Sequence, residues 1–423
     1  MIAVSSVGYA RKDGSRLCGK SGHLETATNC IVLLIWKQNL HRRQFLKLSI
    51  LGTIGSTAGI TGCTVSEVIR GVNTSHKIIK GQYTSAIADQ IPGTSIPGVD
   101  YLLRSGLKAF LDEISKNWND EKIPTQDTYV KYTEHYKSRA IINFNSGLIR
   151  VETIIEDQTK KALKKAIVQT LLTPEDPSAI DLYSAAEPKL GKQPFLVDLV
   201  QDQDKKPIRH QWRAGRYADY LINNNYRQYS LKGKPRYAVN FQMVPDFKIR
   251  QGKHYNYLVS KNAQRFGLEA SLIYGIIETE SSFNPFAVSS APAYGLMQIV
   301  PTTAGRDVYR FLNQRDGIPT KIQLFSPATN IEYGSTYLYI LFNRYLDRIK
   351  DRQTQEYCVI AAYNTGSGNV LRSFDNNRDL AFRKINRLSP KQVYQHLRKN
   401  LSTQEARNYL AKVVTNKQLF YSI

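Results

Sequence analysis

Cysteine and histidine are both scarce in this chain, which has four cysteines and seven histidines among its 423 residues. Cys358 is the only cysteine beyond residue 63, so no disulfide is expected within the body of the protein. Because Cys358 lies in an apolar run, we expect a small buried core residue rather than a nucleophile. The histidines are scattered singly, which argues against a metal site.

Acidic residues are few relative to basic ones: 35 Asp and Glu stand against 58 Lys and Arg, which gives a net charge of +23. A chain this basic is expected to meet a polyanion, such as nucleic acid, an acidic membrane surface or an anionic cell-wall polymer. The sequence has no zinc finger, no RNA-binding aromatic signature and no concentrated Lys/Arg tract, so nucleic acid is disfavoured. The length indicates two domains, and the 42% hydrophobic content is sufficient for buried cores.

Residues 41–62 resemble an export signal of the twin-arginine type. Arg42-Arg43 precedes a mildly apolar stretch, residues 48–62, which is too short and too rich in Gly and Thr to span a bilayer comfortably. The stretch leads into Ile-Thr-Gly-Cys63, which resembles a lipobox, so Cys63 is expected to become the lipidated first residue. A chance arginine pair before a glycine-rich linker is the alternative. The order and spacing of the three features favour export.

The remaining sequence divides by composition. Residues 1–40 precede the signal and are interpreted as a spurious or uncertain N-terminal extension. Residues 63–100, which begin with the lipidated cysteine, are polar and turn-rich and are interpreted as a tether. Residues 101–245 predict an α+β module, with a helix over 101–118, a hairpin over 140–154 that turns at 145–147, a helix over 157–172 with Asp157 as N-cap, and a strand over 236–244.

Residues 246–423 contain almost no strand signals and predict a mainly α domain. Helices are expected over 255–266 with Gly267 as the stop, and over 270–281, 333–349, 355–364 and 404–415.

One acidic residue completes the apolar face of the helix over 270–281. Leu272, Ile273, Ile276 and Ile277 share that face with Glu280. Desolvation and the negative end of the helix dipole are expected to raise the pKa of Glu280, which suits a general acid. A buried glutamate satisfied by a structural hydrogen bond is the alternative, and the helix alone favours neither.

Glu278 lies two residues away on the opposite side of the helix and is expected to be a solvated surface acid.

The residues around this helix favour a catalytic role for Glu280 over a structural one. Ser281-Ser282 can cap the helix end, and Asn284-Pro285 directs the chain into a loop. Tyr363 follows an apolar run and can offer its hydroxyl to a carboxyl group or a sugar.

Together, in this order, several motifs resemble those of the lytic murein transglycosylases, a family of the goose-type lysozyme-like superfamily. The matching residues are Glu280-Ser281, Gly295-Leu-Met-Gln298, Asn330, Gly334, Tyr337-Leu338, Ala362-Tyr-Asn364, Glu405 and Tyr409, with Ser289 at the position of a serine that lines the family's site. The similarity covers about residues 255–415, and residues 136–154 resemble the N-terminal module of a membrane-bound branch of that family.

The resemblance implies a mainly α, lysozyme-like catalytic domain that cleaves the β-1,4 bond between N-acetylmuramic acid and N-acetylglucosamine in peptidoglycan. Glu280 would protonate the leaving oxygen and then act as base on the C6 hydroxyl of the same muramic acid, closing a 1,6-anhydro ring. Tyr363 would orient Glu280, and Tyr409 would close the site from the last helix. The remaining site residues, which would hold the sugars or shape the site, are Ser289, Gly295, Met297, Gln298 and Asn364. No metal or cofactor is implied.

Two other functions compete with this interpretation. A lysozyme-type hydrolase with the same glutamate would need a second acid, for which Asp307 and Glu332 are the nearest candidates in sequence. A non-catalytic peptidoglycan-binding lipoprotein would need no catalytic acid.

The sequence departs from the family pattern at two places. The twin-arginine motif differs from the ordinary secretion signals of the membrane-bound branch, and Pro292 is expected to alter the loop before Gly295. Thr64, where an Asp would indicate inner-membrane retention, favours an outer-membrane lipoprotein that faces the periplasm.

Overall fold

The structure is a computed structural model that describes residues 97–191, 193–289 and 293–423. The predicted signal, lipobox and Cys63 lie outside these residues, as do Pro292 and the predicted tether up to residue 96. Residues 97–100, predicted as the end of the tether, instead begin helix α4 (Pro97–Asn117). The described residues belong to one compact unit, residues 63–423. Among their helices, none is both long and apolar enough to cross a membrane.

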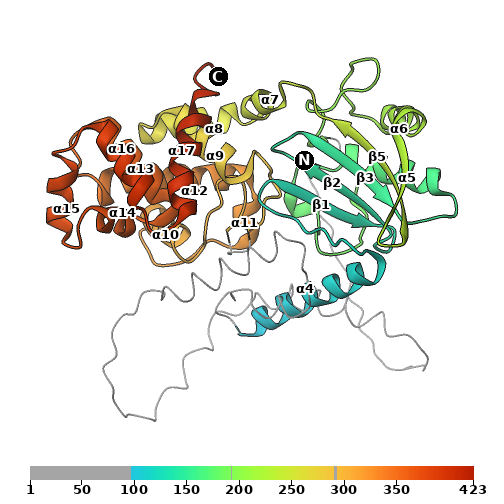
Figure 1. Cartoon of the computed structure of the whole chain (residues 1–423), viewed down its shortest axis with the longest axis horizontal. Helices are drawn as coiled ribbons and strands as arrows, with labels where there is room; N and C mark the ends of the chain where they lie inside the picture. Colours follow the sequence, from blue (N-terminus) through green and yellow to red (C-terminus); the bar gives the residue numbers. More distant parts are fainter. Residues whose placement is uncertain (1–96, 192, 290–292) are drawn as a thin grey trace, which may run out of the picture. The chain divides into compact units, whose positions relative to one another are not determined.

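The first half of the described chain forms a five-stranded antiparallel sheet with helices. In sequence order its elements are α4 (Pro97–Asn117), β1 (Thr128–Thr133), β2 (Ser138–Asn143), β3 (Leu148–Thr153), α5 (Thr159–Leu171), a 3₁₀ turn (Pro177–Ala179), α6 (Gln211–Asn225), β4 (Tyr226–Leu231) and β5 (Lys234–Gln242). The strands lie in the order β1-β2-β3-β5-β4 (Figure 1). The predicted hairpin is β2-β3, in which Asn143 pairs with Leu148.

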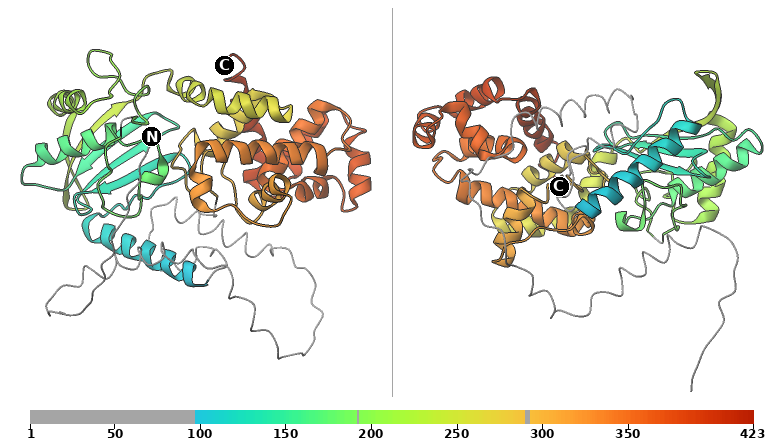
Figure 2. Two further views of the ribbon diagram at one scale, coloured as in Figure 1. Left: turned by 180° about the vertical axis from the view of Figure 1, so that it is seen from behind. Right: turned by 90° about the horizontal axis from the view of Figure 1, so that it is seen from below.

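Alternation along the strands gives the sheet two different faces. One face buries apolar side chains such as Ile149, Val151 and Val239 against α5 and α6. On the opposite face, Ile114 of α4 and Trp118, which directly follows that helix, pack against Tyr132 of β1. Figures 1 and 2 show α4 beside the sheet, away from α5 and α6.

The second half is mainly helical, as expected. Its elements are α7 (Phe247–His254), α8 (Asn256–Phe266), α9 (Ala270–Ser281), α10 (Ala304–Asn313), α11 (Lys321–Phe325), α12 (Pro327–Ile340), a π-helical turn (Leu341–Tyr345), α13 (Arg352–Thr365), α14 (Ser367–Phe374), α15 (Arg378–Ile385), α16 (Pro390–Asn400) and α17 (Gln404–Gln418). Cys358 is fully buried in their shared core, as predicted. The predicted fold class, an α+β module followed by a mainly α domain, is confirmed.

Two of the predicted helices need correction. The helix predicted from Asp157 begins at Thr159, because Gln158 takes a left-handed conformation and is itself the N-cap residue. The helix predicted over 333–349 instead starts at Pro327 and gives way to the π-helical turn after Ile340. Pro327 at the first helical position favours this earlier start, since its missing N–H would have no helical partner there.

Candidate active site

Helix α9 presents Glu280 near its C-terminal end, over the bounds that the sequence predicts. The apolar face that Glu280 completes is buried, with Leu272, Ile273, Ile276 and Ile277 at 1% exposure or less. Glu280 itself keeps partial exposure. The helix then ends at Ser282, which takes a left-handed conformation.

The prediction for Glu278 is wrong. Its side chain is 2% exposed and forms an ion pair with Lys248 of α7, with Nζ 2.6 Å from Oε1. Burial raises the pKa of Glu278, against the influence of Lys248. Helical periodicity placed this residue away from the apolar face, but it could not reveal that α7 packs over that side.

Helix α17 brings a hydroxyl to Glu280. The Tyr409 hydroxyl donates a hydrogen bond to Oε1 of Glu280 at 2.7 Å. The two helices approach closely at Gly275, where an added Cβ would lie 3.0 Å from the backbone nitrogen of Lys417. Asn416 also donates from Nδ2 to the Thr279 hydroxyl at 3.0 Å. The packing of α9 on α17 therefore fixes the geometry around the carboxyl group.

Glu280 has the electrostatics of a group that stays protonated at neutral pH. Burial raises its pKa to about 8, the Tyr409 hydrogen bond opposes that rise, and the charge of Glu405 adds to it. Tyr363 lies close enough for the charge of Glu280 to raise its own pKa, after burial as the larger cause. The predicted direction of the Glu280 shift thus agrees with the structure, and desolvation is its main source.

The segment Gly295–Gln298 forms a tight turn held by Asn330 of α12. The Asn330 side chain accepts from the Met297 backbone N–H at 2.7 Å and donates to the carbonyls of Tyr294 and Leu324, also at 2.7 Å. Gly295 has φ +74°, and a Cβ there would lie 2.4 Å from Asn330 Nδ2. Glycine is therefore required both by backbone conformation and by space.

Tyr363 supports this turn rather than the Glu280 carboxyl group. Its hydroxyl donates to the Met297 carbonyl at 2.8 Å, which corrects the expectation that Tyr363 orients Glu280. Met297 is fully buried against Gly334, where a Cβ would lie 2.2 Å from its sulfur. Asn330 and Tyr363 thus hold the turn beside the end of α9, where Ser281 donates to the Leu296 carbonyl, and the two glycines leave the space that it needs.

The other predicted site residues occupy different environments. Gln298 is 7% exposed, and its Nε2 donates to the carbonyls of Gly295 at 2.8 Å and Ala287 at 3.3 Å. Ser289 is half-buried in the loop that leads to the turn. Asn364 is also half-buried, and its Nδ2 lies 3.4 Å from Oε1 of Glu405. Gln298 therefore uses its amide donors within the protein.

The two candidates for the second acid of the hydrolase alternative form contacts elsewhere. Asp307 accepts a hydrogen bond from the Tyr345 hydroxyl at 2.9 Å. Glu332 pairs with Arg265 across the surface of α8 and α12 at 2.5 Å. In the part of the chain that the structure describes, there is no group of three or more His, Cys, Asp or Glu side chains that could hold a metal ion.

The α+β module contacts the loop that follows Glu280. Phe286 is 1% exposed and packs in the core of that module, with ring centroids 5.0 Å from Tyr129 and 5.2 Å from Phe195. Asn284 donates from Nδ2 to the Gln126 carbonyl at 3.1 Å. Sequence reasoning missed these contacts, because nothing local marks a phenylalanine whose partners lie about 90–160 residues earlier.

Two family models match the chain in succession. The model described as the N-terminal domain of membrane-bound lytic murein transglycosylase C matches residues 100–254. The transglycosylase SLT domain matches residues 257–386, which include Glu280, the Gly295–Gln298 turn and Tyr363.

Two solved structures are similar to a smaller part of the chain. They are an inactive mutant of the lytic transglycosylase Slt from Pseudomonas aeruginosa (25% identity, 41% of this chain, TM-score 0.31) and the 70 kDa soluble lytic transglycosylase from Escherichia coli (26% identity, 38% of this chain, TM-score 0.31). The matches span 24% and 23% of those longer chains.

Relatives of similar length give the more extensive match. A membrane-bound lytic murein transglycosylase C from Yersinia enterocolitica is 43% identical over 286 residues, which cover 67% of this chain and 80% of the relative. One from Histophilus somni is 42% identical over 307 residues, which cover 72% and 84%. The chain therefore belongs to the membrane-bound lytic murein transglycosylase C family.

Proposed function

We propose that this lytic murein transglycosylase cleaves the β-1,4 bond between N-acetylmuramic acid and N-acetylglucosamine with Glu280 as its single catalytic carboxyl group. Protonated Glu280 gives its proton to the bridging oxygen as the bond from that oxygen to C1 of the muramic acid breaks. The resulting carboxylate then takes the proton of the C6 hydroxyl of the same muramic acid. As that proton leaves, the C6 oxygen forms a bond to C1. The product is a 1,6-anhydro ring, and Glu280 regains its proton.

The observation that carries this proposal is the raised pKa of Glu280, about 8, beside the Tyr409 hydroxyl. A carboxyl group that is protonated at neutral pH can act first as acid, and the Tyr409 hydrogen bond stabilises the carboxylate that follows. An internal hydroxyl nucleophile needs no bound water or second carboxylate, because its effective concentration is high. Asp307 and Glu332, whose side chains bond elsewhere, have no part in this scheme.

The other predicted site residues are proposed to act around this carboxyl group. Gly295, Met297 and Gln298 form the turn that Asn330 and Tyr363 hold, and we assign them to shaping the wall of the sugar site. Their backbone and the side chains of Ser289 and Asn364 are the groups proposed to meet the sugars. Tyr409 is proposed to position Glu280.

Mass spectrometry of digested peptidoglycan sacculi tests the reaction. We expect muropeptides that end in anhydromuramic acid, each one water lighter than the hydrolysed product, and no such products from the Glu280→Gln chain. Reducing-end muramic acid would instead establish the hydrolase. Full activity of Glu280→Gln in cells would establish the non-catalytic scaffold.

The cell-envelope location follows from the family, and we propose in addition a lipid anchor at Cys63 in the outer membrane, facing the periplasm. The lipobox-like sequence and the word "membrane-bound" in the names of the relatives support this proposal. Sucrose-gradient fractionation of cells should find the chain in outer-membrane fractions and the Cys63→Ala variant in soluble ones. Membrane retention of Cys63→Ala would refute the anchor.

A further inference from the structure

One face of the five-stranded sheet is only partly covered. Helix α4 packs on that face over β1, where it meets Val130 and Tyr132. Over β3, β5 and β4 the same face carries mostly polar side chains. On it, Arg150 of β3 lies opposite Asn240 of β5. Ala238 of β5 lies between Glu152 of β3 and Arg227 of β4. This part of the sheet contains a hollow of about 490 Å³, lined by Arg150, Arg227, Gln228, Tyr229, Ala238 and Asn240.

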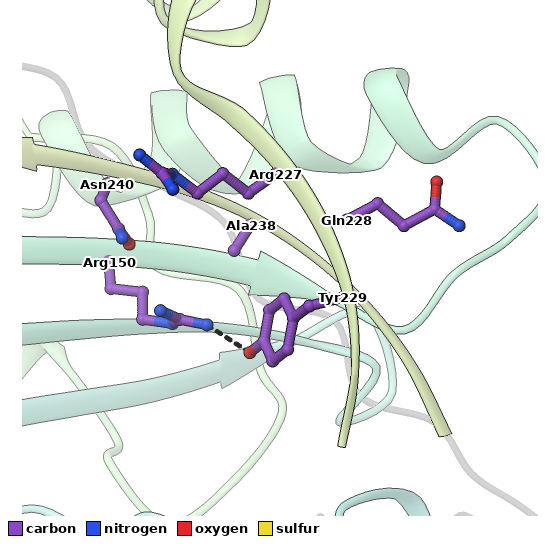
Figure 3. A pocket seen from close by; sticks show the side chains of 6 residues that line it. All are labelled: Arg150, Arg227, Gln228, Tyr229, Ala238 and Asn240. Carbon is purple, nitrogen blue, oxygen red and sulfur yellow. Dashed lines mark hydrogen bonds between the residues drawn. The ribbon is translucent and has the colours of Figure 1, made fainter. Parts of the chain in front are cut away.

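The hollow exists because a small residue lies among large ones. Ala238 provides the floor, and the longer side chains of Arg150, Arg227 and Tyr229 stand around it (Figure 3). Arg150 donates to the Tyr229 hydroxyl, and that hydroxyl donates to Oε2 of Glu152 at 2.6 Å. Arg150 and Tyr229 are therefore held in place before any ligand arrives, which reduces the entropy lost on binding.

Positive charge exceeds negative charge on and beside this part of the face. Four arginines (Arg139, Arg150, Arg227, Arg236) stand against two acids (Asp120, Glu152). Among the described residues, Arg227 has no hydrogen-bond or ion-pair partner. The fully buried Arg236, opposite Tyr229 in the register, forms an ion pair with Asp120, with Nη2 3.8 Å from Oδ1, and its Nε has no hydrogen-bond acceptor. Clustered arginines that outnumber their acidic partners favour an anionic ligand.

The hollow also contains an unsatisfied acceptor. The side-chain carbonyl oxygen of Asn240 is buried and has no hydrogen-bond donor. A simple carboxylate offers acceptors for the arginines but no donor for Asn240. A peptide with a free carboxylate supplies both, since each peptide N–H is a donor.

We propose that this sheet hollow binds a carboxylate-bearing stem peptide of peptidoglycan, with Arg227 and Arg150 on the carboxylate and Asn240 on a peptide N–H. The choice of peptidoglycan as the source rests on the proposed function. The carboxylate of such a peptide complements the excess arginine charge, and a volume of a few hundred Å³ suits a few peptide residues. The α+β module would then hold the wall through its peptides while Glu280 acts on its sugars.

Isothermal titration of the full chain with a sugar-free peptidoglycan tetrapeptide tests this assignment. Arg227→Gln should weaken binding at least about fivefold, because it removes one charged, fork-shaped donor that is partly exposed to water. Lys160→Gln removes one exposed cation from α5, the helix on the opposite face, and should change affinity less than about twofold. Amidation of the peptide carboxylates should abolish binding, and equimolar inorganic phosphate should not displace the peptide.

Three results would overturn the proposal: no binding of the tetrapeptide, equal losses in Arg227→Gln and Lys160→Gln, or displacement by phosphate. The first two would show that the hollow does not bind the peptide, and the third that it binds anions without selecting a peptide. Because the tetrapeptide contains no glycosidic bond, its binding is independent of Glu280. Failure here therefore differs from failure of the anhydro-product experiment, which reports on the reaction alone.

Discussion

Removal of the Tyr409 hydroxyl should raise the pKa of Glu280. In the wild-type chain this hydroxyl donates to Glu280 Oε1 at 2.7 Å and lowers the pKa that burial raises to about 8. A hydrogen bond to a charged group contributes about 1.5–3 kcal/mol, and the lower limit applies because Glu280 is partly exposed. Since about 1.4 kcal/mol equals one pKa unit, Tyr409→Phe should raise the pKa by about one unit.

The pH dependence of kcat/KM on soluble glycan strands measures this shift. In the proposed mechanism activity requires protonated Glu280, so it should fall as pH rises through the pKa, near 8 in the wild-type chain. In Tyr409→Phe this alkaline limb should move up by about one unit. The plateau below it should fall up to about tenfold, because the developing carboxylate loses its hydrogen bond in the transition state.

Tyr363→Phe is the matched control, because it removes a hydroxyl that donates to the Met297 carbonyl instead of to Glu280. Its alkaline limb should move less than that of Tyr409→Phe. The reasoning would be refuted if the limb of Tyr409→Phe stayed in place or moved to lower pH, or if Tyr363→Phe gave the larger shift.

Three further predictions concern stability. The folded pKa of Glu280 is raised above its unfolded value, so the stability it contributes is present below pH 4.5 and is lost as pH rises through about 8. Glu280→Gln should therefore raise the free energy of unfolding by about 1–2 kcal/mol at pH 8 and little at pH 4, measured by denaturant titration; an equal gain at both would contradict this. Phe286→Ala should destabilise the chain by about 3–5 kcal/mol through a cavity between aromatic rings, while Phe286→Leu should lose less; equal losses would count against the packing argument. Lys248→Met should cost about 3 kcal/mol at neutral pH because Glu278 stays buried without its cation, and adding Glu278→Gln should restore part of it; no restoration would reject the ion pair as the cause.

Much of the fold could be predicted because its signals are local. The bounds of α9, the stop of α8 at Gly267 and the β2-β3 hairpin follow from periodicity, a left-handed glycine and turn residues over short windows. The start of α5 was missed because a left-handed Gln158 is set by the preceding turn, which no helix-cap pattern describes. The π-helical turn after Ile340 was missed for a similar reason, since helical periodicity continues through it.

The sequence by itself determined the family, the helix that carries Glu280 and the apolar face that the carboxyl completes, because motif order and helical periodicity are properties of the chain alone. Tertiary structure decided which groups surround that carboxyl. It placed Tyr409, rather than Tyr363, on Glu280, and it buried Glu278 beneath Lys248. These contacts join residues 30 or more positions apart, so they depend on how helices pack, which no local pattern encodes.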